Sequence, residues 1–312
     1  MTEPKIAAKF AQVVQKIAPQ SKLLRTWVLP GGISAQLTAL AVLLPTGQIQ
    51  KMVVRQPGAR AIQHNPQAAA DEFKLLQAMQ SAGVTTPAPY LLDQSGEIFA
   101  APYIVMEYME GQPDFAPAQI DDCVRQIATQ LAKIHRVDLS MLDLPFLPQQ
   151  TVTSAQAFKA RPATLDESLD EGQIRAILEA AWPLPPLNQP ALLHGDFWPG
   201  NLLWQAGQLV AVVDWEDAAV GNPLTDFAIS RLDILWIFGR DAMHEFTRHY
   251  QAVATLDFTQ LPYWDLSAAL RPAGRIAEWA AGWPALGRSD ITEQTMRAGH
   301  GWFITQAFAQ LA

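Results

Sequence analysis

Residues 193–204 read LHGDFWPGNLLW, and residues 212–216 read VVDWE. Asn201 follows Asp196 by five positions, and Asp214 follows Asp196 by eighteen. A short apolar run over 209–213 leads directly into Asp214, so we expect a strand that presents this carboxylate at its end. Carboxylate and amide side chains in this order are typical of a site that binds Mg²⁺ and transfers a phosphoryl group.

Each of these residues also has an ordinary structural explanation. Taken alone, Asp196 is explained as a loop cap and Asn201 as a turn residue. Their combination with a strand that ends in Asp214 favours chemistry, because phosphoryl transfer needs a positioned hydroxyl, bridging metal ions and charge stabilisation. Asp196 is therefore predicted to be the catalytic base or orienting group. Asn201 and Asp214 are predicted to be the metal ligands.

Secondary structure signals change character along the chain of 312 residues. Apolar residues at helical spacing predict a first helix over 4–18, and short apolar runs with turn signals predict strands around 36–44, 52–55, 90–92 and 103–106. A helix is expected over 67–79 between these strands. After about residue 111 helices dominate, with helical patterns over 119–135 and 170–181 and beyond 226. The pattern places a lobe boundary near 106–111.

The interval from Asp196 to Asn201 is also that of the protein-kinase catalytic loop. With His194-Gly195-Asp196 in place of His-Arg-Asp and 214–216 in place of Asp-Phe-Gly, the chain resembles the aminoglycoside phosphotransferase and choline kinase superfamily of small-molecule kinases. The resemblance is specific in the second lobe and loose in the first. It implies an α+β, protein-kinase-like bilobal fold with a small antiparallel-sheet N-lobe over 1–105, a hinge over 106–111 and a mainly helical C-lobe over 112–312.

The resemblance also assigns nucleotide-binding residues. Gly31, Gly32 and Ser34 lie where the family's nucleotide loop lies, and backbone N–H groups there can hold phosphates. Two glycines by themselves predict only a turn. Glu107 and Met109 would read the nucleotide base through backbone groups of the hinge, and they are predicted by position only.

A basic residue on the third strand departs from the kinase pattern. Kinases place a Lys there to hold the phosphates, whereas this strand carries Lys51 and Arg55 on the same face. We favour Arg55, because it occupies the expected inward position and an arginine can still bind phosphate. Glu72 on the following helix is predicted to pair with Arg55. The simpler reading of Glu72 is a solvated acid on a helix surface.

The same resemblance also implies which residues hold the catalytic loop and which would contact the acceptor molecule. His194 and Asp226 are expected to hold the catalytic loop in place, and a helix N-cap explains Asp226 equally well. The acceptor would bind among the helices after Asp226. Candidate acceptor residues are Trp198, Glu216, Trp236, Trp279 and Trp283, although tryptophans more often belong to a core.

The charge and composition of the chain limit the kinds of partner and the location that we expect. The chain carries 22 Lys and Arg against 30 Asp and Glu, for a net charge of −8 and no basic run, so we expect no nucleic-acid partner. No apolar stretch is long enough for a membrane span, and the N-terminus lacks the apolar run of a signal peptide, so a cytoplasmic location is expected. The acidity mildly favours a cationic acceptor.

The resemblance implies transfer of the terminal phosphate of ATP or GTP, with Mg²⁺, to a hydroxyl of a small molecule, including an aminoglycoside-like or other amine-bearing acceptor. Two alternatives stay open. One is a catalytically inactive nucleotide-binding protein of the same fold, supported by Arg55 in place of Lys. The other is a metal-dependent hydrolase that uses the same carboxylates with water. The motif does not identify the acceptor, the choice between ATP and GTP, or the oligomeric state.

Overall fold

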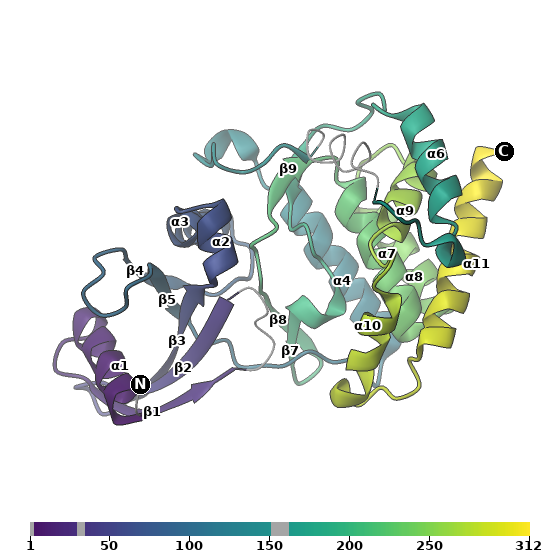
Figure 1. Cartoon of the computed structure of the whole chain (residues 1–312). Helices are drawn as coiled ribbons and strands as arrows, with labels where there is room; N and C mark the ends of the chain where they lie inside the picture. The colour runs from purple at the N-terminus through teal and green to yellow at the C-terminus, as the bar shows by residue number, and fades with distance from the viewer. Residues whose placement is uncertain (1–2, 30–34, 151–161) are drawn as a thin grey trace. The chain divides into compact units, whose positions relative to one another are not determined.

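The computed structural model describes residues 3–29, 35–150 and 162–312. The chain divides into two compact units, Met1–Glu110 and Gly111–Ala312, which are shown in Figure 1. The first unit contains an antiparallel sheet with helices, and the second is mainly helical. This confirms the expected α+β class with a small antiparallel sheet before a larger helical part.

The first unit is built on a five-stranded antiparallel sheet with the order β1-β2-β3-β5-β4. Arg55 in the third strand lies opposite Leu37 in the second and Ile104 in the fifth. The strands are β1 (Lys22–Val28), β2 (Ala35–Leu43), β3 (Ile49–Pro57), β4 (Pro89–Asp93) and β5 (Tyr103–Glu107). The central position of β3 explains why its middle residues are buried.

Helices lie against the sheet because successive strand residues point to opposite faces. Met52 and Val54 of β3 join a buried cluster with Phe10, Val13 and Val14 of helix α1 (Glu3–Ile17). Arg55 has the opposite parity and pairs with a residue of helix α3 (Ala68–Ser81). A short helix that the sequence did not predict, α2 (Ala59–His64), precedes α3. Because side chains alternate along β3, Arg55 points away from the cluster that packs against α1 and toward α3.

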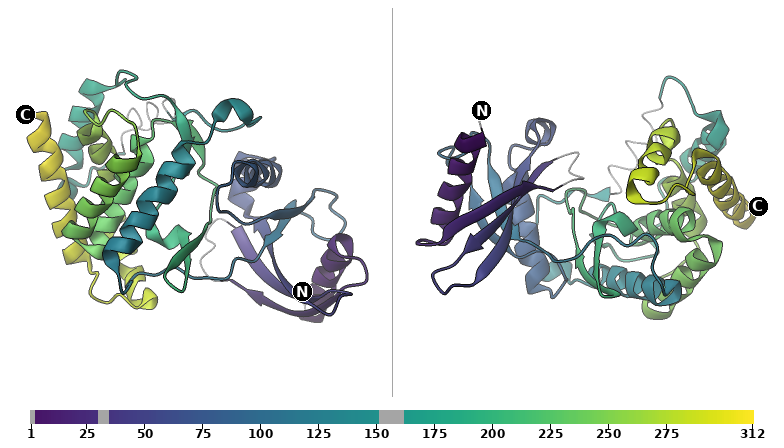
Figure 2. Two further views of the ribbon diagram at one scale, coloured as in Figure 1. Left: turned by 180° about the vertical axis from the view of Figure 1, so that it is seen from behind. Right: turned by 90° about the horizontal axis from the view of Figure 1, so that it is seen from below.

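The second unit packs its helices around α7 (Leu224–Phe238), in which 13 of 15 residues are buried. Helix α7 contacts α8, α9 and α11, and α4 packs along α8, as the view from behind in Figure 2 shows. The remaining helix bounds are α4 (Ile120–His135), α6 (Glu171–Ala181), α8 (Arg240–Val253), α9 (Leu261–Ala269), α10 (Ile276–Gly282) and α11 (Glu293–Leu311). In the part of the chain that the structure describes, no helix has the length and apolar character that a membrane crossing requires.

Two short strand pairs carry the loops of interest in the second unit. Strand β6 (Ala191–Leu193) pairs with β9 (Ala219–Gly221), and β7 (Leu202–Gln205) pairs with β8 (Gln208–Val212). Residues 194–201 therefore run from β6 into β7, and Asp214 follows β8. The two pairs bring the HGD loop and the VVDWE segment together.

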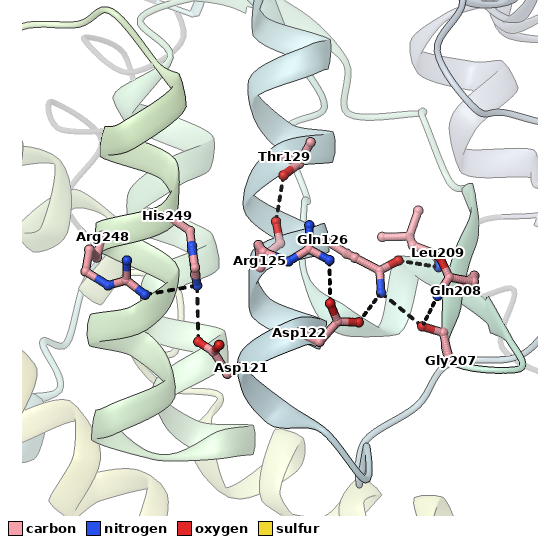
Figure 3. A network of polar contacts seen from close by, with 10 residues as sticks. All are labelled: Asp121, Asp122, Arg125, Gln126, Thr129, Gly207, Gln208, Leu209, Arg248 and His249. Carbon is pink, nitrogen blue, oxygen red and sulfur yellow. Dashed lines mark hydrogen bonds and ion pairs between the residues drawn. The ribbon is translucent and has the colours of Figure 1, made fainter.

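Helix α4 fixes the turn between β7 and β8. The Gln126 amide donates to the Gly207 carbonyl at 2.9 Å and accepts from the Leu209 N–H at 3.0 Å; both contacts are drawn in Figure 3. Asp122 in turn accepts a hydrogen bond from Gln126 at 2.8 Å. The strand pair that carries the predicted metal ligands is thus tied to a long helix.

Candidate active site

The catalytic loop is anchored by a buried carboxylate. Asp226, in the first turn of α7, is fully buried and accepts hydrogen bonds from the backbone N–H groups of His194 at 2.6 Å and Gly195 at 3.0 Å. Burial alone would raise the pKa of Asp226, but the hydrogen bond and charge of His135 and the hydrogen bond from the His194 backbone N–H lower it overall. An ionised carboxylate that accepts two backbone hydrogen bonds in this way fixes the direction in which the loop leaves β6.

Gly195 is required by the close approach of the two segments. Its φ is +86°, and a Cβ atom there would lie 2.1 Å from the carbonyl oxygen of Asp217. A side chain is excluded both by the backbone conformation and by the lack of space. The loop therefore lies directly against the segment that follows Asp214.

His194 links the same two segments through its ring. Its Nε2 atom lies 3.0 Å from the carbonyl oxygen of Val213, and its Nδ1 atom lies 3.3 Å from the backbone nitrogen of Asp196. A carbonyl only accepts, so Nε2 carries the proton and Nδ1 accepts from the Asp196 N–H. The ring is fully buried and packs against Trp215, with ring centres 4.7 Å apart. His194 thus holds Asp196 on one side and the residue before Asp214 on the other.

Asp196 and Asn201 form a direct pair. The Asn201 Nδ2 atom donates to the Asp196 carbonyl at 2.9 Å and to its Oδ2 atom at 3.2 Å. The carbonyl of Asn201 accepts from the Val213 N–H at 3.0 Å. Because the amide nitrogen is used on Asp196, the amide oxygen is the group that Asn201 can offer to a cation.

Asp214 follows β8 in a left-handed conformation, with φ 66°. It lies one residue after Val213, which both His194 and Asn201 bind. Although Asp217 is exposed, its pKa is raised by desolvation in the surrounding protein and by the negative charges of Asp196, Glu216 and Asp214. A concentration of carboxylates around Asn201 and Asp214 fits an oxygen-liganded divalent cation such as Mg²⁺.

An arginine contacts the other oxygen of the predicted catalytic residue. The guanidinium of Arg271, just after α9, donates from Nη2 to Oδ1 of Asp196 and from Nη1 to Oδ2 of Asp233 at 3.3 Å. Burial raises the pKa of Asp233 to about 7; the charge of Arg271 opposes that rise and the charge of Asp196 adds to it. The three side chains form a chain of charges that ends at Asp196.

Aromatic side chains surround this end of the loop. Trp198 stacks on Phe115, with ring centres 6.1 Å apart, and Phe115 meets Trp283 edge-on at 5.4 Å. The Arg271 guanidinium lies 5.8 Å from the ring centre of Trp279. Trp236 is 9% exposed and donates its indole N–H to the Met296 carbonyl at 2.9 Å, so it could offer a ligand only part of its ring.

The first unit holds the predicted phosphate-binding pair. Arg55 is 5% exposed, and its Nε atom donates to Oε2 of Glu72 at 2.8 Å. Lys51 is instead exposed at the end of the strand and pairs with Glu110 at 2.6 Å. Among the two candidates, Arg55 makes the predicted contact with Glu72. Its role in binding phosphate stays a prediction.

The structure describes only some of the other residues that are predicted to bind the nucleotide. Gly31, Gly32 and Ser34 lie outside the described residues. Glu107 donates its backbone N–H to the Ala88 carbonyl at 2.8 Å, so this N–H group is already used within the protein. Met109 is partly buried in the segment that follows β5.

A different group of possible metal ligands lies on α4 and α8. Within 3–29, 35–150 and 162–312, Asp121, Glu245 and His249 are the group of three acidic or histidine side chains close enough to share a cation. Arg248 already contacts His249 at 3.3 Å and pairs with Glu245, as Figure 3 shows in part. A guanidinium occupies the place that a cation would need, so this group is better explained as a surface ion-pair network.

A family model described as the phosphotransferase enzyme family matches residues 32–270. The chain belongs to this family. The matched range of the phosphotransferase includes Arg55, Asp196, Asn201 and Asp214. It ends one residue before Arg271.

Solved structures show that the phosphotransferase has the fold of small-molecule kinases. A GDP and kanamycin complex of an aminoglycoside phosphotransferase has a TM-score of 0.58 at 16% identity, over 96% of this chain and 98% of that chain. A macrolide 2'-phosphotransferase from Brachybacterium faecium has a TM-score of 0.59 at 15% identity, over 95% and 97% of the two chains. The structures confirm the predicted kinase-like fold class.

Curated relatives are longer proteins. The phosphotransferase is 26% identical to "Acyl-CoA dehydrogenase family member 10" of Mus musculus over 199 residues, which are 59% of this chain and 18% of the mouse protein. It is 26% identical to "Acyl-CoA dehydrogenase family member 11" of Gallus gallus over 230 residues, which are 66% of this chain and 29% of the chicken protein. The chain thus spans less than a third of either relative.

Several residues near the site of the phosphotransferase were not predicted from the sequence. Asp233 lies in α7 and Arg271 in the turn after α9, both without a motif, and only the fold brings them to Asp196. His135 of α4 lies 3.4 Å from Asp226 and 2.6 Å from the Tyr250 hydroxyl, so it links two more helices to the loop anchor. A histidine in the last turn of an amphipathic helix is the signal that the sequence offers for it.

Proposed function

We propose that this protein transfers the terminal phosphate of ATP or GTP to a hydroxyl of a small molecule. The proposal rests on one observation. Asn201 is hydrogen-bonded directly to Val213, the residue before Asp214, and Asp196 is linked to Val213 through the His194 ring. His194 binds both Asp196 and Val213, and Asn201 binds both Asp196 and Val213. A predicted base and two predicted metal ligands are thereby fixed in one small volume, as phosphoryl transfer requires.

Asp196 would orient the acceptor hydroxyl and accept its proton. Its Oδ2 atom is turned toward Asn201, so Oδ1 is the oxygen that faces away from the metal ligands. A side chain that is 28% exposed can be reached by an acceptor. General bases in such positions typically contribute a factor of roughly 10²–10⁴ to the rate.

Asn201 and Asp214 would hold Mg²⁺. When bound, the ion neutralises charge on the phosphates and orients them for in-line attack. In the first unit, the Arg55–Glu72 pair would direct a cation at the phosphates, and the backbone of Glu107 and Met109 would contact the base. The kinship with aminoglycoside kinases solved with GDP, and with ADP in another case, supports a purine nucleotide as the donor. A nucleotide donor suits the expected cytoplasmic location.

The acceptor is a small molecule with a hydroxyl, and its class stays open between two possibilities. The net charge of −8 and the kanamycin complex of one structural neighbour favour an aminoglycoside-like or other amine-bearing acceptor. The names of the curated relatives point instead toward proteins that act on acyl-CoA, although the chain spans only a part of them. Trp198, Trp279, Trp283 and Glu216 are the side chains that would contact it.

A two-step experiment tests the proposal. ATP and GTP are first compared with and without Mg²⁺ in a thermal-shift assay, and we expect a rise in Tm that needs the metal. ADP release is then measured over a panel of hydroxylated acceptors with wild type and Asp196→Asn. Acceptor-dependent ADP release that is lost in Asp196→Asn supports the proposal, whereas equal release by both proteins contradicts it.

The same measurements separate the two alternatives. A nucleotide-binding protein without activity would show the Tm rise but no acceptor-dependent release of ADP. A metal-dependent hydrolase would show no Tm rise with nucleotide. The presence of Asp196, Asn201 and Asp214 together argues against the first alternative, and the Arg55–Glu72 pair argues against the second.

A further inference from the structure

We propose that Arg271 binds an anionic group of the acceptor, so that the preferred substrate carries a carboxylate or phosphate near the hydroxyl that is phosphorylated. This inference rests on the proposed function and names the substrate class of the same site. It reverses the preference for a cationic acceptor that net charge alone suggests.

The first step is the position of Arg271 relative to the two oxygens of Asp196. Asn201 donates to Oδ2, whereas Arg271 donates to Oδ1. Oδ2 therefore faces the predicted metal ligand, and Oδ1 faces the side from which an acceptor hydroxyl would approach. An acceptor that reaches Oδ1 lies next to the guanidinium.

The second step is that Asp196 does not need Arg271 for its orientation. The backbone nitrogen of Asp196 is held by His194, and its carbonyl and Oδ2 are held by Asn201. The side chains of Arg271 and Asp196 are 29% and 28% exposed, whereas that of Asp233 is 10% exposed. The cation thus lies between a more buried carboxylate, Asp233, and the accessible Asp196, and it is itself as exposed as Asp196.

The third step concerns charge. An amine brought to Oδ1 would place a second cation beside Arg271 on one carboxylate, and the two cations would repel each other. A carboxylate or phosphate would instead accept from the guanidinium and draw it from Oδ1, which frees that oxygen for the hydroxyl. Arginine suits this exchange, because its planar group can bind two oxygens of an anion side by side.

The fourth step is the surface beside the guanidinium. Arg271 and Arg275 lie 5.8 Å and 5.5 Å from the ring centre of Trp279, so one aromatic ring is flanked by two cations. The side chain of Arg275 is 56% exposed. Arg275 already pairs with Glu278 at 3.6 Å, so Arg271 is the cation that the ring would present to an anion while its face packs against an apolar part of the ligand. Such a surface favours a negatively charged acceptor.

The test compares acceptors that differ only in charge. Straight-chain hydroxycarboxylic acids, their primary amides and amino alcohols of equal length are offered to the whole protein with labelled ATP and Mg²⁺. We expect kcat/KM for the acids to exceed that for the amides by roughly tenfold or more, the scale of a hydrogen bond to a charged group. Equal or better use of amides or amino alcohols overturns the inference and leaves the proposed function intact.

Variants then assign the preference to one side chain. Arg271→Met should raise KM for the acids by roughly tenfold to a hundredfold and change KM for the amides little, and Arg271→Lys should restore part of the loss. The double variant Asp233→Asn with Arg271→Met avoids an unpaired buried charge, so it serves if the single variant is unstable. Arg248→Met, at an exposed ion pair on α8, is the matched control.

The outcomes separate this inference from the function on which it rests. An equal fall of kcat for every acceptor in Arg271→Met would show that Arg271 only positions Asp196, and it would overturn the inference. Transfer to no member of the panel, by a protein that binds nucleotide, counts against the proposed function and against the inference together. A preference for acids that disappears in Arg271→Met supports both.

Discussion

The Oδ2 atom of Asp226 lies 2.6 Å from the backbone nitrogen of His194, although the two residues are 32 positions apart. The contact joins the start of the loop that contains Asp196 to the first turn of α7. Because both groups are buried, water cannot replace either partner. The geometry of the loop therefore depends on this carboxylate.

Asp226→Ala should destabilise the protein and impair transfer. It leaves the buried N–H of His194 and the partly buried N–H of Gly195 without their acceptor, which costs about 3 kcal/mol. Asp226→Asn keeps one acceptor oxygen and should lie between Ala and wild type. Urea denaturation and kcat report the two effects. Exposed Asp290 changed to Asn is the control, and a fall in stability no larger than that control would contradict the assignment of Asp226 as the anchor.

Gly195→Ala should abolish transfer. A Cβ atom would lie 2.1 Å from the Asp217 carbonyl oxygen, so the loop or the segment after Asp214 has to move. Gly207→Ala is a matched control, because Gly207 also has a positive φ of +75° but no atom lies within 4 Å of its Cβ position. The control should cost about 1–2 kcal/mol from backbone conformation and retain kcat. Similar kcat values for the two variants would show that the close approach is unimportant.

Asp196→Asn should reduce transfer by roughly 10²–10⁴-fold, because the amide cannot accept the hydroxyl proton. The substitution is almost isosteric, so nucleotide affinity should be retained. Single-turnover transfer and nucleotide titration measure the two quantities. Wild-type turnover in this variant would remove Asp196 from the mechanism.

Arg55→Ala should weaken ATP binding by roughly tenfold to a hundredfold, the scale of a lost charged hydrogen bond. The buried pair with Glu72 points this arginine, rather than exposed Lys51, to the phosphate role. Lys51→Ala is the control and should bind ATP as wild type does. Isothermal titration of ATP into each variant measures this affinity. If Lys51→Ala weakens ATP binding and Arg55→Ala does not, the phosphate contact is made by Lys51, four residues earlier on β3.

Asp233 should give stability an unusual pH dependence. Burial raises its pKa to about 7 in the folded protein, above the ordinary value near 4, so the folded state binds this proton more tightly than the unfolded state. Its contribution to stability is present at low pH and is lost as the pH rises from about 4 through about 7. Asp233→Asn removes that loss, worth up to about 4 kcal/mol.

Free energies of unfolding at pH 5 and pH 8 test this sign. The wild type should lose stability relative to Asp233→Asn as the pH rises, since other titrating groups are common to both proteins. A difference between the two proteins that stays constant over this range would show that Asp233 is ionised throughout.

The parts of the site that the sequence predicts are those encoded by local spacing. The five-residue interval from Asp196 to Asn201 is enough to place both side chains on one turn, and the structure joins them at 3.2 Å. The Arg55–Glu72 contact followed from the resemblance to kinases, which place a cation on this strand and its acidic partner on the next helix.

Arg271 could not be predicted in this way. It lies 75 positions from Asp196, in a turn after α9, and the two meet only because α7 and α9 pack together. The six residues of α2 were missed for a related reason, because a single helical turn and a half carries little apolar periodicity. Contacts set by helix packing need the fold itself.

The burial of α7 has a consequence for amide hydrogen exchange. The N–H groups of His194 and Gly195 sit on a loop, yet their acceptor belongs to a helix with 13 of 15 residues buried. These two amides are protected while the loop stays bound to α7, so we expect them to exchange as slowly as core amides. Backbone amides in turns that lack such an anchor should exchange much faster. The start of the loop that contains Asp196 should therefore show exchange rates typical of the core.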